Sequence, residues 1–129
     1  MILGVGLDIC EVGRIQKNIE IFGSFFSNII LTRNERIQGK LETNFSIYLA
    51  SLFATKEAFY KAFMVPNQSK LHWQDIEIIK NCDKKIEICL SKKANKLLDN
   101  CLPQNKNCDF ITNIVSVNNF IISKVIIKF

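Results

Sequence analysis

The sequence contains few of the residues that stabilise small secreted or zinc-binding domains. It has one histidine and five cysteines among 129 residues, and no two cysteines have the Cys-x-x-Cys spacing. An odd number of cysteines with a lone histidine excludes a zinc-finger pattern. The same composition favours reduced thiols in a cytoplasmic protein.

The sequence also lacks long apolar runs and an export signal. The longest stretches without a charged residue are 43–55 and 110–123, and both are shorter than the roughly 18 residues that cross a bilayer. The first eight residues, MILGVGLD, contain no basic segment and no cleavage site. We therefore expect no membrane-spanning helix and no targeting segment.

What remains is the composition of one folded domain. Hydrophobic residues make up 48% of the chain, charged residues make up 22%, and there are ten phenylalanines. This balance excludes a disordered chain. A length of 129 residues suits a single domain spanning 1–129 that buries a core without disulfides.

The net charge of +5 at pH 7 favours an acidic partner or an anionic ligand. A lysine excess spread over a solvated surface would give the same number. A small basic RNA-binding module is another alternative. However, the aromatic residues do not alternate with basic ones, and no RRM or KH signature is present. We therefore expect no nucleic-acid partner.

Hydrophobic periodicity predicts an α+β fold. A short buried strand is expected at 2–7, ending at Asp8, with a helix following at 11–22. The spacing of Thr32 and Glu35 predicts a capping box that opens another helix. The other predicted elements are an aromatic-rich connection at 25–31, an apolar helix at 46–64, strands at 73–78 and 85–90, a helix at 91–101 capped by Ser91, and strands at 110–117 and 120–127 joined by Asn118 and Asn119.

The helix expected at 46–64 carries its only charges at Lys56, Glu57 and Lys61. Such an apolar helix is covered on most sides, and covered charges need partners or ligands. Glu57 and Lys61 lie four residues apart, in the order that favours an ion pair within the helix. Asp8 suits either a helix cap or a metal ligand. Together, Asp8, Glu57 and Lys61 would form a magnesium and phosphate site, but spacing alone leaves these alternatives open.

Four segments follow one another in a fixed order. They are GLDICEVGRI at 6–15, LTRNE at 31–35, LASLFATKEAFYKA at 49–62 and WQDIEI at 73–78. This series resembles the motifs of the holo-[acyl-carrier-protein] synthases, which are small 4′-phosphopantetheinyl transferases. The resemblance is strongest over 3–90. It implies the fold of that family, in which an antiparallel sheet packs with helices around one long central helix, and a homotrimer with active sites between subunits.

The resemblance also implies a function. The family transfers 4′-phosphopantetheine from coenzyme A to a serine of apo acyl carrier protein, with Mg²⁺, and releases adenosine 3′,5′-bisphosphate. Carried onto this sequence, Asp8 and Glu57 would be the catalytic metal ligands, and Glu57 would also be the base. Lys61 would pair with a phosphate of coenzyme A. Lys56 and Ser116 would belong to the same coenzyme A site, Lys56 with a less defined role.

The first predicted helix supplies the partner surface. Arg14, Lys17, Asn18 and Ile21 share one face of it. The family meets its acidic carrier protein with a basic face of this helix, so these residues are expected to steer and contact that protein. An ordinary solvated helix face would have the same spacing.

Three features depart from the family pattern. Leu52 stands where the family has an arginine, and the segment 64–70 lacks the usual glycines. Ser116 takes the place of a late histidine, while the lone histidine, His72, is expected to be a surface or turn residue. These departures support an alternative, in which the chain is a catalytically weakened homologue that still binds the carrier protein.

Overall fold

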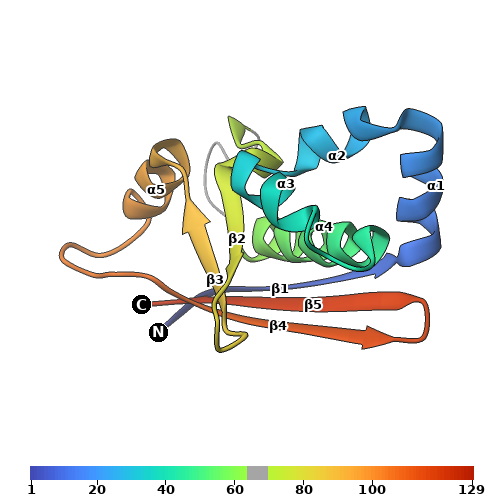
Figure 1. Ribbon diagram of the computed structural model, residues 1–129. Coiled ribbons are helices and arrows are strands. Elements are labelled where there is room, and N and C mark those ends of the chain that lie inside the picture. The colour runs from blue at the N-terminus through green and yellow to red at the C-terminus, as the bar shows by residue number, and fades with distance from the viewer. Residues whose placement is uncertain (64–69) are drawn as a thin grey trace.

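The computed structural model describes residues 1–63 and 70–129. Its architecture is the α+β class that the sequence predicts, with helices lying to one side of an antiparallel sheet (Figure 1). In the described part of the chain, no helix is long and apolar enough to cross a membrane. The elements are β1 (Ile2–Glu11), α1 (Val12–Phe22), α2 (Ser24–Ile30), α3 (Arg33–Gly39), α4 (Phe45–Ala62), the 3₁₀ turn η2 (Trp73–Asp75), β2 (Ile76–Lys80), β3 (Ile86–Leu90), α5 (Lys92–Asp99), β4 (Asp109–Val117) and β5 (Phe120–Lys128).

The long helix α4 lies against one face of the three-stranded sheet, whose strand order is β1–β5–β4 (Figure 1). A separate antiparallel hairpin joins β2 and β3. Alternate residues of β5 are buried, including Val125 and Ile127. Leu49 and Phe59 of α4 are fully buried as well. The core therefore forms where one apolar helix meets one face of one sheet.

Two glycines allow β1 to lie directly on α4. A Cβ added to Gly6 would be 1.8 Å from the carbonyl oxygen of Ala58, and one added to Gly4 would be 1.9 Å from that of Ala62. Any side chain at either position would therefore force the strand and the helix apart. Strand and helix run antiparallel, and the next strand residue on the same face is Asp8. The two glycines thus bring the Asp8 carboxylate to the surface of α4.

Strand β1 is longer than the sequence predicts. The expected end of the strand at Asp8 is wrong, because Asp8 pairs with Ser123 and the ladder continues to Glu11 opposite Phe120. Strand β5 supplies backbone partners along this whole length, so the strand passes through a charged residue. It is also covered on one face only, since Ile9 is 60% exposed.

The segment 25–31 is helical, although the sequence predicts a connection there. Helix α2 is seven residues long. Ser27 and Ile30, one turn apart, are its buried residues. This short helix is stabilised by tertiary packing, since a helix of seven residues has little stability by itself.

The segment 73–75 forms the 3₁₀ turn η2, and strand β2 begins only after it. The Asp75 carboxylate accepts a hydrogen bond from the backbone N–H of His72 at 2.8 Å. Such a local bond competes with strand pairing. The prediction that the strand begins at 73 is therefore wrong.

Other local predictions are confirmed. The capping box is present, with Thr32 N–H donating to Glu35 at 2.8 Å and Glu35 N–H donating to Thr32 at 3.3 Å. The Ser91 side chain caps α5. Asn118 has a φ of 53° in the turn between β4 and β5, a conformation that asparagine tolerates.

Candidate active site

Asp8 and Lys61 form an ion pair where β1 crosses α4. The Lys61 ammonium lies 2.8 Å from Asp8 Oδ1, and it also donates to the carbonyl oxygen of Leu7 at 3.2 Å. The Asp8 side chain is 14% exposed, whereas that of Lys61 is 54% exposed. The carboxylate is therefore fixed by its strand, while the ammonium lies at the surface on a flexible stem.

In the described ranges the hydrogen-bond partner of Glu57 is not Lys61, although the two residues lie four positions apart on α4. It is Trp73, whose indole N–H donates to Glu57 Oε1 at 2.9 Å. Glu57 and Lys61 nevertheless share one face of α4, because they lie four residues apart. Since Lys61 contacts Asp8, Glu57 lies one helical turn from that ion pair. We call Asp8, Glu57 and Lys61 the Asp8 corner.

Lys56 lies inside the core and not at this corner. Its side chain is 0% exposed, and its ammonium donates to Glu35 Oε1 at 2.6 Å and to the carbonyl oxygen of Ile30 at 2.7 Å. Burial lowers the pKa of Lys56, and the adjacent Glu35 carboxylate opposes that shift. The position of Lys56 does not support the expectation that it belongs to the coenzyme A site, because its ammonium is fully covered.

Glu35 is the partner that the sequence did not reveal. Its Oε1 accepts hydrogen bonds from Thr32 N–H and from Lys56, and its Oε2 accepts one from Ile78 N–H at 2.9 Å. One carboxylate thus ties α3, α4 and β2 together. The capping-box spacing identified Glu35 as a helix cap, but no local spacing points to Lys56, 21 residues further along the chain.

A shallow pocket of about 250 Å³ adjoins the Asp8 corner. Burial, followed by the charges of Asp75 and Glu57, raises the pKa of Tyr60 in its wall to about 12. That phenol therefore stays protonated near neutral pH. The residues that line the pocket are Glu57, Tyr60, Leu71, His72 and Trp73.

His72 and Ser116 are both exposed. His72 precedes η2, which confirms the prediction of a surface or turn residue. Ser116 of β4 pairs with Ile121 of β5, and Ile121 pairs with Cys10 of β1. Alternation along the strands therefore places Ser116 on the sheet face that carries the aspartate of the Asp8 corner.

Leu52, at the position of the family's arginine, is only 5% exposed. It lines a cavity of about 530 Å³ together with Ile78, Ile86 and Ile114. A leucine cannot replace a cation, although Lys80 and Lys84 line the same cavity. The glycine-poor segment of the sequence, apart from Lys70, lies outside the described residues.

The surface predicted for the partner lies on α1, directly after the strand that carries Asp8. Arg14 and Lys17 are exposed and Asn18 is half-buried. Ile21 is 63% exposed. The face thus offers two cations and one accessible apolar side chain to the solvent.

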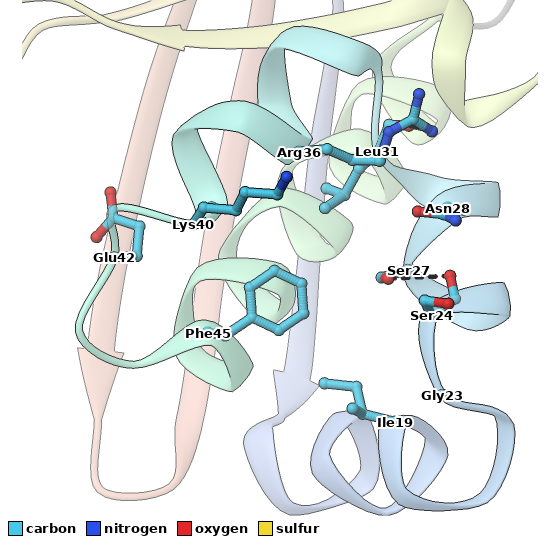
Figure 2. Close-up of a pocket in the computed structure, with 11 residues that line it drawn as sticks. Ile19, Gly23, Ser24, Ser27, Asn28, Leu31, Arg36, Lys40, Glu42 and Phe45 are labelled. Carbon is cyan, nitrogen blue, oxygen red and sulfur yellow. Dashed lines mark hydrogen bonds between the residues drawn. The ribbon is translucent and has the colours of Figure 1, made fainter.

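A larger cavity lies away from the Asp8 corner. Figure 2 shows it between α1, α2, α3 and the start of α4. Its volume is about 550 Å³. Ile19, Leu31 and Phe45 supply its apolar walls, and Arg36 and Lys40 also line it. The three residues of the Asp8 corner do not line this cavity.

The comparisons with known proteins agree with this fold. The family model described as the 4′-phosphopantetheinyl transferase superfamily matches residues 4–114. The chain therefore belongs to that class of proteins. Within it, the chain belongs to the holo-[acyl-carrier-protein] synthase family and is an enzyme.

Three relatives illustrate the match. The chain is 36% identical over 97 residues to a holo-[acyl-carrier-protein] synthase of Protochlamydia amoebophila, covering 75% of this chain and 80% of that protein. A solved synthase from Neisseria meningitidis has a TM-score of 0.88 at 26% identity, with both chains fully covered. A synthase from Helicobacter pylori, solved in complex with coenzyme A, has a TM-score of 0.79 at 27% identity, covering 96% and 99% of the two chains.

Proposed function

We propose that the chain transfers 4′-phosphopantetheine from coenzyme A to a serine of apo acyl carrier protein, with Mg²⁺ bound at the Asp8 corner. The observation that carries this proposal is the placement of Asp8 and Lys61 in contact, with Glu57 one helical turn away. Membership of the family supports the reaction. The coenzyme A bound by the Helicobacter pylori relative supports the donor substrate.

The donor set of the corner fits Mg²⁺. This ion takes one or two carboxylates and completes its shell with water and substrate phosphates, and the carboxylates here would be Asp8 and Glu57. Among the residues that the structure describes, no three His, Cys, Asp or Glu side chains cluster as a metal site. When bound, Mg²⁺ would neutralise charge on the pyrophosphate of coenzyme A.

The transfer exchanges one bond at phosphorus for another. The serine oxygen of the carrier protein attacks the phosphorus that bears the pantetheine, and the bond from this phosphorus to the bridging oxygen breaks. Adenosine 3′,5′-bisphosphate leaves with the electron pair. Glu57 accepts the hydroxyl proton, directly or through one water. The exposed Lys61 ammonium exchanges Asp8 for phosphate oxygens.

The exposed face of α1 would receive the carrier protein. Arg14 and Lys17 attract an acidic partner and raise the rate of encounter. Ile21, which is 63% exposed, adds an apolar contact, and Asn18 lies between these groups. The face begins directly after the strand that carries Asp8, so a partner docked there lies next to the corner.

A homotrimer would cover a second exposed surface. The sheet face opposite α4 carries apolar side chains on all three strands, and one subunit leaves them open to solvent. Burying such a face between subunits is favourable. Its members, with their exposed fractions, are Val5 54%, Leu7 53%, Ile9 60%, Ile111 42%, Val115 52%, Val117 47% and Phe120 45%.

A catalytically weakened homologue is the second candidate function. The buried Leu52 removes one cation from the coenzyme A site, and Ser116 supplies no imidazole at the position of the family's histidine. If Ser116 occupies the position of the family's histidine, Ser116→His will raise the transfer rate. An unchanged rate would mean that another residue occupies that position in the site.

Mass spectrometry of the carrier protein tests the proposed function. The chain is incubated with apo acyl carrier protein, coenzyme A and Mg²⁺, and the carrier is expected to gain one phosphopantetheine group. Asp8→Ala and Glu57→Ala should each abolish this gain, while Glu11→Ala, an exposed carboxylate on the same strand as Asp8, should not. No gain in carrier mass at high enzyme concentration would overturn the proposal.

A further inference from the structure

The indole of Trp73 is bonded to the carboxylate that the proposed function uses as base and metal ligand. Its Nε1–H donates to Glu57 Oε1 at 2.9 Å in a partly buried contact. Hydrogen bonds to an ionised acceptor are stronger than those between neutral groups. Because this bond engages one oxygen, it restrains the carboxylate and leaves Oε2 free of the indole.

The ring itself is held by the same helix. Its centroid lies 6.0 Å from that of Phe53, at an interplanar angle of 41°. Phe53 precedes Glu57 by one turn of α4, so the indole contacts two successive turns of one helix face. Ring packing and hydrogen bond therefore restrain the indole and the carboxylate together.

The backbone that carries Trp73 is tied to two other elements. Gln74 donates to the carbonyl oxygen of Asn28 in α2 at 2.6 Å. Asp75 accepts from the Ser91 hydroxyl, at the start of α5, at 2.7 Å. The donor of the bond to Glu57 is thus fixed to the rest of the fold.

We propose that Trp73 is a positioning residue, whose indole N–H holds the Glu57 carboxylate with its second oxygen directed at the reacting groups. This inference rests on the proposed function. Partners that orient a metal-binding carboxylate typically change metal affinity or activity by 10–100-fold when they are removed. Trp73 would act in this way on Glu57 without touching the substrate.

The chain has a single tryptophan, so the hydrogen bond is observed directly. A ¹H–¹⁵N correlation spectrum of the full chain contains one indole N–H peak. Glu57→Gln replaces the charged acceptor by a neutral amide, and we expect the peak to move upfield because the bond weakens. An unmoved peak would show that Trp73 does not hold Glu57, whatever the activity of the enzyme.

Trp73→Phe tests the role of this bond, because it keeps a ring against Phe53 and removes the N–H. We expect the Mg²⁺ concentration for half-maximal transfer to rise roughly 10–100-fold. The affinity for Mn²⁺ in the presence of coenzyme A, measured by electron paramagnetic resonance, should fall by the same factor. Tyr48→Phe is the matched control, since it removes another aromatic donor bond of α4, to the Glu35 carbonyl oxygen at 2.8 Å, and should change neither value.

Two failures are distinguishable. If the wild-type chain transfers nothing, the proposed function is overturned, and the spectrum of Glu57→Gln still decides whether the contact exists. If the wild-type chain is active but Trp73→Phe has the metal dependence and Mn²⁺ affinity of the wild type, the positioning role is overturned and Trp73 only packs.

Discussion

Two lysines of helix α4 form ion pairs in opposite surroundings. Lys56 contacts Glu35 at 2.6 Å, and both side chains are almost completely buried. Lys61 contacts Asp8 at 2.8 Å with half of its own side chain exposed. Both pairs join α4 to a distant part of the chain. The two pairs differ in burial and therefore in what they can do. Only an ammonium at the surface can leave its carboxylate and bind a substrate phosphate.

The buried pair is fully satisfied by other bonds. The Glu35 carboxylate also accepts from two backbone N–H groups, and the Lys56 ammonium also donates to a carbonyl oxygen. Loss of one member leaves the other charged and unpaired inside the core, which is costly. The exposed pair has water as an alternative partner for each charge, so its loss costs little. The buried Lys56 charge therefore belongs to the core, whereas the Lys61 charge stays accessible to solvent.

Removal of the buried ammonium should give the largest effect. For Lys56→Met we expect the free energy of unfolding to fall by about 3–5 kcal/mol, because the Glu35 carboxylate is left unpaired. Urea unfolding followed by circular dichroism measures this loss. Lys61→Met, the matched control on the same helix, should lose less than about 1 kcal/mol. Equal losses in the two variants would mean that burial does not distinguish the pairs.

The exposed pair depends on close contact between strand and helix, and Gly6→Ala should disturb it. The new Cβ would lie 1.8 Å from the Ala58 carbonyl oxygen, so we expect a loss of about 1–3 kcal/mol in unfolding free energy. Displacement of the strand should also raise the Mg²⁺ concentration that transfer requires. Gly13→Ala, whose Cβ would meet the Asn119 side chain at 3.3 Å, should cost much less. A Gly6→Ala variant of wild-type stability would refute the direct contact.

Double-mutant cycles measure the interaction energy within each of the two ion pairs, without the cost of unpaired charges. The cycle of Lys56→Met with Glu35→Gln should give an interaction energy of about 1–3 kcal/mol. The cycle of Lys61→Met with Asp8→Asn should give about 0.2–1 kcal/mol. A reversed order of the two energies in chemical denaturation would contradict the assignment of structural and chemical roles.

Salt should give the smallest difference. Raising the ionic strength from 0.1 M to 1 M shortens the screening length from about 10 Å to about 3 Å. The stability difference between wild type and Lys61→Met should then shrink by a few tenths of a kcal/mol, while that between wild type and Lys56→Met stays constant. Thermal unfolding of the three proteins at both salt concentrations measures this. A salt-dependent Lys56→Met difference would indicate that water reaches the buried pair.

Prediction from sequence succeeded where the determining contacts are local. The capping box of Thr32 and Glu35, the Ser91 cap and the asparagine turn all depend on groups within a few residues of one another. It failed where a distant partner decides the structure. Strand β1 continues past Asp8 because β5 pairs with it, and α2 forms because its buried face packs against other elements.

The site shows the same division. Sequence motifs identified Asp8, Glu57 and Lys61 as a group, and the structure brings them to one corner. The motifs did not separate Lys56 from its neighbours, because the three charged positions of the helix look alike until other elements cover one of them. The Trp73 bond to Glu57 at 2.9 Å was likewise missed, since no spacing rule connects an indole on one element with a carboxylate on another.

The sequence by itself therefore determined the α+β class, the family and the identity of the charged residues, because these depend on residue type and periodicity. Only the tertiary structure decided which carboxylate each lysine meets. Glycines at positions 4 and 6 bring Asp8 onto α4 for Lys61, whereas α3 and β2 enclose Glu35 around Lys56. Burial, which no local pattern specifies, is the physical reason that one ammonium stabilises the core and the other remains available to a phosphate.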